Sequence, residues 1–124
     1  MEASKTVLIV DDSRVSRMII RTMINNNRPE WTVIEASCSD EALVKVASAT
    51  IDLMILDHNM PGMLGMDLAA ILKKQFPQAM ITLLTANIQQ STQERAAELG
   101  INFTKKPVSE EKIERILDSA DQRP

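Results

Sequence analysis

An uninterrupted apolar segment in the middle of the chain places the strongest constraint on its fold. Leu53–Leu56 is a run of four apolar residues, followed directly by Asp57 and then by a loop that contains Pro61 and Gly62. A strand with one face in water alternates apolar and polar residues, whereas a strand covered on both faces does not alternate. The segment therefore predicts a central strand of a parallel sheet, with helices covering both of its faces.

Strand-like and helix-like patterns alternate along the rest of the chain. We expect further strands at about residues 6–10, 31–36, 79–84 and 102–105, with 31–36 at a sheet edge because it alternates. Helices should begin at about residues 14, 40, 66, 89 and 110, with Ser13 and Ser39 as caps. The side chains expected to face the core are Val15, Met18, Ile19, Thr22, Met23, Leu43, Val46, Ala47, Leu68, Ile71, Leu72, Ile113, Ile116 and Leu117. Five strand–helix units predict an α/β domain with a parallel sheet.

Polar side chains follow four of the predicted strands. They are Asp11, Asp12, Asp57, Thr85, Lys105 and Lys106, and the backbone N–H of Ala86 follows Thr85. Each has an ordinary explanation by itself: a helix cap, a turn residue or a solvated lysine. The carboxyl ends of parallel strands meet at one edge of a sheet, however, and that edge is where α/β proteins bind ligands. Together these residues indicate a functional site.

The same residues resemble the receiver domain of bacterial two-component response regulators, of the kind found alone in chemotaxis response regulators. The resemblance rests on Val10–Ser13, Leu56–Gly62, Thr85–Ala86 and Lys106–Pro107, which follow the family's order and approximate spacing. It implies a (βα)5 flavodoxin-like fold with five parallel strands in the order 2-1-3-4-5. We expect residues 1–124 to form one receiver domain without an output domain.

A magnesium site is expected where the acidic residues converge. In the implied strand order the first and third strands are neighbours, so Asp11, Asp12 and Asp57 should lie close together. Three nearby carboxylates repel one another unless a cation lies among them, and hard oxygen ligands favour Mg²⁺ over zinc. The resemblance implies that Asp12, Asp57 and the backbone carbonyl of Asn59 bind Mg²⁺ directly, and that Asp11 acts through a bound water.

The resemblance also assigns the phosphoryl chemistry. Asp57 is the expected nucleophile, which accepts a phosphoryl group from a histidine kinase or a small phosphodonor. Lys106, the Thr85 hydroxyl and the Ala86 N–H are expected to bind the phosphoryl oxygens. Thr85 and Phe103 are the expected switch residues, although an ordinary core role for Phe103 is equally open.

Other features follow the family less closely. Phe103 lacks the hydroxyl of the tyrosine often found there, so a readout that needs an aromatic oxygen is excluded. Asn59 and Asn87 each lie two residues beyond a site residue and could orient a hydrolytic water. The resemblance does imply, however, that the Lys106–Pro107 peptide bond is cis.

The composition of the chain limits the kinds of partner that it can bind. The net charge of −3 and pI near 5.1 argue against a nucleic-acid surface, and no apolar run approaches membrane length. The lone Cys38 fits a reducing cytosol. We therefore expect a cytoplasmic protein with no nucleic-acid or membrane partner. The family resemblance implies that it binds a sensor histidine kinase and a downstream protein target. The target should bind near the helix at 89–99, the strand at 102–105 and the last helix.

The sequence argues against three other functions. An aspartyl phosphohydrolase would need an acid–base residue and a substrate-selecting cap, and the sequence suggests neither, so we expect a signalling protein rather than an enzyme. A flavin carrier would need a Ser/Thr/Gly-rich phosphate loop where Asp11 and Asp12 stand. The complete set of acids argues against an unphosphorylated interaction module.

Overall fold

Five β-strands and five α-helices alternate along the chain in the computed structural model, which describes residues 4–87 and 89–122. The strands are β1 (Thr6–Val10), β2 (Thr32–Ala36), β3 (Leu53–Asp57), β4 (Met80–Thr85) and β5 (Asn102–Lys105). The helices are α1 (Arg14–Asn27), α2 (Ser39–Val46), α3 (Gly65–Gln75), α4 (Gln90–Leu99) and α5 (Glu110–Asp121).

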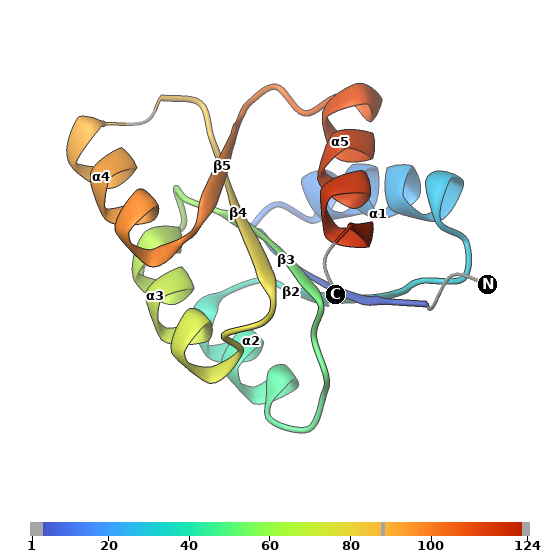
Figure 1. The fold of residues 1–124 in the computed structure, drawn as a ribbon, viewed down its shortest axis with the longest axis horizontal. Coiled ribbons are helices and arrows are strands. Elements are labelled where there is room, and N and C mark those ends of the chain that lie inside the picture. Colours follow the sequence, from blue (N-terminus) through green and yellow to red (C-terminus); the bar gives the residue numbers. More distant parts are fainter. Residues whose placement is uncertain (1–3, 88, 123–124) are drawn as a thin grey trace.

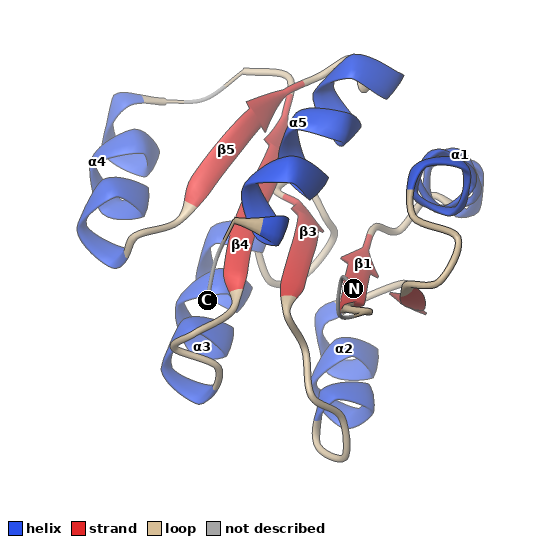
Figure 2. Ribbon diagram, turned by 45° about the vertical axis from the view of Figure 1, so that its right-hand side comes forward, coloured by secondary structure: helices blue, strands red, loops and turns tan. Residues whose placement is uncertain are grey.

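All five strands pair in parallel, in the order β2-β1-β3-β4-β5, so the predicted topology is confirmed. The labelled strand arrows point the same way in Figure 2, and β2 is parallel to β1, so the carboxyl ends of the strands meet at one edge of the sheet. Val10 pairs with Leu56, and Asp57 pairs with Leu84. This register places Asp57 one residue beyond the last pair of β1 and β3.

Helices cover both faces of the sheet, with α1 and α5 on one side and α2, α3 and α4 on the other (Figure 1). Successive residues of a strand point to opposite faces. Leu53 and Ile55 accordingly join the core under α1 and α5, whereas Met54 and Leu56 join the other core. The lack of alternation in this segment reflects burial on both sides, as predicted.

The predicted inward face of α1 is wrong except at Met23, which packs against the core; Thr22 is exposed. Val15, Met18 and Ile19 are 60%, 58% and 43% exposed, and the buried residues of the helix are Ile20 and Ile24. Six apolar residues of α1 lie on more than one face of the helix, so their periodicity fits two alternative stripes. Packing against the sheet selects the stripe that includes Ile20 and Ile24.

Smaller corrections apply to α2 and α3. The helix α2 begins at Ser39, with Cys38 at the capping position, and it buries Ala42 and Val46 rather than Ala47. In α3 the expected core residue Ile71 is 41% exposed. The inward residues of α3 include Leu68 and Leu72, which lie one turn apart, as predicted.

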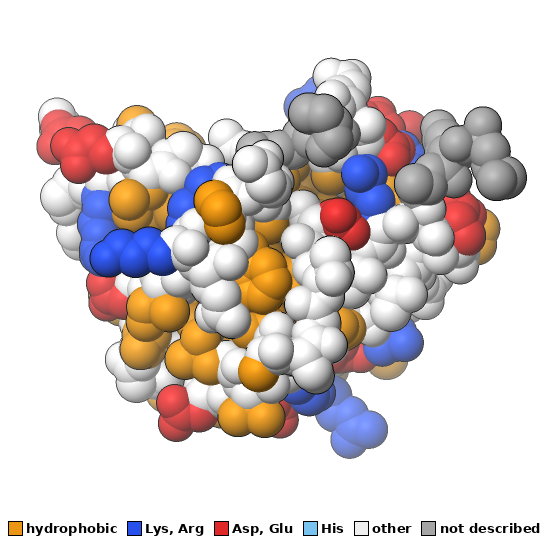
Figure 3. All heavy atoms as spheres, turned by 60° about the horizontal axis from the view of Figure 1, so that its bottom comes forward, with side chains coloured by type: hydrophobic (Ala, Val, Ile, Leu, Met, Phe, Trp, Pro, Cys, Tyr) orange, Lys and Arg blue, Asp and Glu red, His pale blue; other side chains and the backbone are white. Residues whose placement is uncertain are grey.

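The surface carries charges of both signs. Figure 3 shows one face on which hydrophobic side chains gather near the centre and charged side chains lie around them. In residues 4–87 and 89–122, none of the helices combines the length and the apolar character needed to cross a membrane.

Candidate functional site

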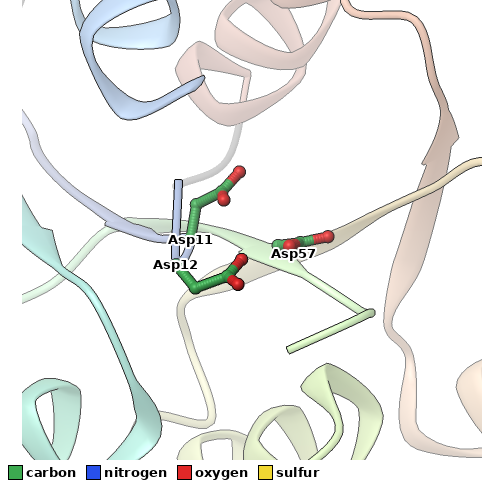
Figure 4. Close-up of side chains that lie close together, drawn as sticks. All are labelled: Asp11, Asp12 and Asp57. Atoms are coloured by element: carbon green, nitrogen blue, oxygen red, sulfur yellow. The ribbon is translucent and has the colours of Figure 1, made fainter. Parts of the chain in front are cut away.

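Three carboxylates meet at the carboxyl-terminal edge of the sheet. Asp57 ends β3, while Asp11 and Asp12 follow β1, and one oxygen from each lies within 4.8 Å of the others (Figure 4). Asp11 and Asp57 are each only 3% exposed, whereas Asp12 is open to solvent. The predicted convergence is therefore present, and the cluster has an exposed side.

Burial sets the electrostatics of Asp11. Loss of solvent raises the pKa of this carboxyl above its usual value, and repulsion from Asp57 and Asp12 acts in the same direction. A hydrogen bond of 2.8 Å from the Ser13 N–H to Asp11 Oδ1 opposes the rise, as does the ammonium group of Lys106. The protein therefore offsets only part of the cost of burying a negative charge on Asp11, and a bound cation would offset more of it.

Lys106 supplies a positive charge directly to the cluster. Its Nζ lies 2.8 Å from Asp57 Oδ1, and its backbone N–H donates to the carbonyl of Thr85 at 2.9 Å. The adjacent Lys105 is exposed, so Lys106 is the lysine that reaches the site. The Lys106–Pro107 bond is cis, as the resemblance implied.

The end of β4 provides a buried hydroxyl. Thr85 is 1% exposed, and its Oγ1 has no hydrogen-bond partner among the described residues. A cavity of about 350 Å³ lies beside it, lined in part by Ala86, Asn87 and Phe103. Phe103 is 44% exposed, so the core role that we left open for it is wrong.

The loop after β3 is held tightly against the start of α3. The His58 N–H donates to the Leu84 carbonyl, and the His58 carbonyl accepts from the Gly65 N–H at 2.9 Å. The His58 ring accepts a bond of 3.2 Å from Met66 N to Nδ1. Asn59, the expected carbonyl ligand, donates its backbone N–H to Asp57 Oδ1 at 3.3 Å. The loop geometry is therefore coupled to the position of Asp57.

Sequence reasoning missed Arg17 beside the site. Its Nη1 donates to the Asp11 carbonyl at 2.5 Å, and its Nε donates to Glu35 Oε1 at 3.2 Å. The helical spacing of Arg17 with Ile20 and Ile24 places it on the inward face of α1. This spacing is a signal in the sequence that would identify Arg17, provided that Ile20 and Ile24 are known to be the buried residues of α1.

Comparison with known proteins identifies the family. A model of the response regulator receiver domain matches residues 7–118. The chain belongs to this family. It is 32% identical over 119 residues to the chemotaxis protein CheY of Pseudomonas aeruginosa, and the match covers 90% of this chain and 95% of that protein.

Another relative is a much longer protein, of which this chain spans only a small part. The chain is 35% identical over 98 residues to the sensor protein EvgS of Escherichia coli, covering 79% of this chain but only 8% of EvgS. Among solved structures, the chemotaxis protein CheY4 of Vibrio cholerae matches with a TM-score of 0.86 and 26% identity, over 95% of this receiver domain and 99% of that chain.

Proposed function

We propose that this receiver domain is a signalling switch in which Asp57 accepts a phosphoryl group. The observation that carries the proposal is the Lys106–Asp57 ion pair of 2.8 Å within a group of three carboxylates. Phosphoryl transfer depends mainly on positioning and charge neutralisation, and this site provides both.

In the proposed reaction, a carboxylate oxygen of Asp57 attacks the phosphorus atom of a phosphohistidine or a small phosphodonor. An O–P bond forms as the bond to the leaving group breaks, and the leaving group takes the electron pair and a proton from solvent. The product is an acyl phosphate on Asp57. Lys106 would then turn from the carboxylate to a phosphoryl oxygen, while the Thr85 hydroxyl and the Ala86 N–H bind another.

Mg²⁺ is the proposed cofactor because the residues present fit it. All three carboxylates offer hard oxygen ligands from the same edge of the sheet. Asp12, Asp57 and the Asn59 carbonyl would bind the ion directly, and Asp11 would act through a water. When bound, Mg²⁺ would offset negative charge on the phosphoryl oxygens.

The proposed switch joins Thr85 to Phe103. The Thr85 hydroxyl lacks a partner among the described residues, so a phosphoryl oxygen on Asp57 would provide one. Movement of Thr85 toward that oxygen would change the cavity of about 350 Å³ that Phe103 also lines. An inward turn of Phe103 would then alter the surface of α4, β5 and α5, where we propose that a downstream protein binds.

A sensor histidine kinase is the proposed donor. A groove of about 470 Å³ is lined by residues of α1 and of the loop after β5, and it includes Asp11 and Lys106. It therefore offers an approach to the acid cluster. We propose that the protein acts only on its own phosphoryl group and is not an enzyme toward other substrates.

Incubation with phosphoramidate, with and without Mg²⁺, tests the function. Intact mass spectrometry should show one added phosphoryl group only with Mg²⁺, labile to hydroxylamine as expected of an acyl phosphate. A protein that remains unmodified, or that is modified equally without Mg²⁺, would contradict the proposal.

A further inference from the structure

A second lysine holds the loop that carries Lys106. Lys112 Nζ donates to the carbonyl oxygens of Lys105 at 2.7 Å and Pro107 at 2.9 Å. These two carbonyls lie on either side of Lys106 in the sequence. A single ammonium group therefore ties together the backbone on both sides of the residue that contacts Asp57.

The helix dipole of α5 does not favour a lysine at the position of Lys112. This residue lies in the first turn of α5, after Glu110 and Glu111. The N-terminus of a helix carries partial positive charge, so an acidic residue is favoured there and a cation is not. The two bonds to carbonyl oxygens compensate for this cost, because hydrogen bonds from a charged donor are stronger than neutral ones.

Lys112 is itself firmly placed. Its backbone N–H donates to Ser109 Oγ at 3.2 Å, and the next residue, Ile113, is fully buried against the sheet. On the other side of the loop, the Lys106 N–H donates to the Thr85 carbonyl on β4. The Lys106 backbone is thus attached to the sheet directly and to α5 through Lys112.

We propose that Lys112 is a positioning residue that controls phosphoryl transfer by fixing the backbone of Lys106. This inference rests on the proposed function of Lys106 at Asp57. Without the two carbonyl bonds, the loop would sample other positions, and the Lys106 ammonium would spend less time beside the reacting oxygen. Small displacements of a catalytic group are costly to the rate.

The test measures the initial rate of acyl phosphate formation from phosphoramidate and Mg²⁺. Lys112→Met should reduce the rate by about threefold or more through lost positioning. The separate variant Lys112→Arg should react at nearly the wild-type rate, since a guanidinium can also donate to two carbonyls. Arg115→Met, one turn later on α5 and paired only with Glu111 among the described residues, is the control and should match the wild type. Thermal melts of every variant check the fold. If Lys112→Met melts below the assay temperature, Lys112→Gln takes its place in the test.

A double-mutant cycle separates positioning from a general effect on the fold. Lys106→Met should slow the reaction by about a hundredfold, because it removes a charge aimed at the phosphoryl group. In that background Lys112→Met should have less than about a twofold further effect, since contacts that act through one group are not additive. An equal loss in both backgrounds would overturn the positioning role. A normal rate for Lys112→Met with a slow Lys106→Met would overturn the inference alone, and a normal rate for Lys106→Met would overturn the role of Lys106 as well.

Discussion

A Cβ atom at Gly65 would lie 2.4 Å from the backbone carbonyl oxygen of Asp57. It would also lie 2.7 Å from the Cα of His58. Both neighbours are backbone atoms, which cannot rotate away as the end of a flexible side chain can. The first residue of α3 therefore packs directly against the strand end that carries Asp57.

Gly65→Ala should consequently disturb both the fold and the chemistry. Adding a methyl group where there is no space costs about 1–3 kcal/mol of stability. The displacement of the Asp57 backbone should also slow phosphoryl acceptance by more than the loss of folded protein explains. Urea unfolding and the initial rate with phosphoramidate measure the two effects.

Gly100→Ala is the matched control for this prediction. Gly100 ends α4 with φ of +70°, and a Cβ added to it would meet no other atom within 4 Å. The left-handed conformation costs alanine about 1 kcal/mol, but the site is not involved. We expect lower stability with a normal rate, so a normal rate for Gly65→Ala as well would show that the α3 contact does not position Asp57.

Asp57→Asn should abolish phosphoryl acceptance while leaving the fold intact. The amide has nearly the shape of the carboxylate but is not nucleophilic. Asp52→Asn is a suitable control, because Asp52 caps the opposite end of the sheet through a 2.9 Å bond from Thr6 N. Stoichiometric label on another residue of Asp57→Asn would show that the acceptor is misassigned.

Removing a carboxylate from the acid cluster should stabilise the metal-free protein and weaken Mg²⁺ binding. Asp11→Asn keeps an acceptor for the Ser13 N–H but removes a charge that burial disfavours. Its melting temperature without Mg²⁺ should exceed that of the wild type at pH 7. Asp12→Ala should gain less, because Asp12 is exposed.

Adding Mg²⁺ should make the wild type the most stable of these three proteins. Ligand binding raises the stability of the folded state by mass action, so the wild type should gain most. Both variants should show a smaller shift in thermal melts. An equal Mg²⁺-induced shift in all three proteins would place the ion outside this cluster.

The strands could be predicted because β3 and its neighbours are buried on both faces, whereas the order of the strands came from the family resemblance. Such strands are uniform in hydrophobicity, and Leu53–Leu56 therefore carries an unambiguous signal. The positions of the candidate site residues on the sheet could be predicted for the same reason, since Asp11, Asp57 and Thr85 directly follow or end these strands. Their position along the sequence fixes their position on the sheet.

The helix faces and the supporting contacts could not be predicted in this way. Helix α1 has apolar residues on two faces, and the sheet, rather than the helix, decides that Ile20 is buried and Met18 exposed. The bonds of Arg17 to the Asp11 carbonyl and of Lys112 to the carbonyls around Lys106 depend on loop geometry. Backbone acceptors leave no residue-type signal in the sequence.

Glu35 should make stability depend on pH. The hydrogen bond from Arg21 lowers the pKa of Glu35, and Arg17 acts in the same direction. A carboxyl whose pKa is lower in the folded state stabilises the fold above its unfolded pKa, and this stabilisation is lost as pH falls through the folded pKa. Glu35→Gln should therefore be less stable than the wild type at pH 7, and the difference should shrink below the ordinary value of 4.5. Glu111→Gln, from an exposed pair, should show little effect at either pH.

Phe103→Ala should weaken binding of the phosphorylated form to its target while leaving the stability of the protein nearly unchanged. Its side chain is 44% exposed, so its removal leaves no closed cavity, unlike Leu83→Ala at a buried neighbour on β4. The measurement is a pull-down of protein targets with and without beryllofluoride, which mimics the acyl phosphate. The wild type should capture a partner only with beryllofluoride, and Phe103→Ala should capture much less of it. Capture that is equally strong with Phe103→Ala, or that is independent of beryllofluoride, would remove Phe103 from the proposed switch while leaving Asp57 as the acceptor.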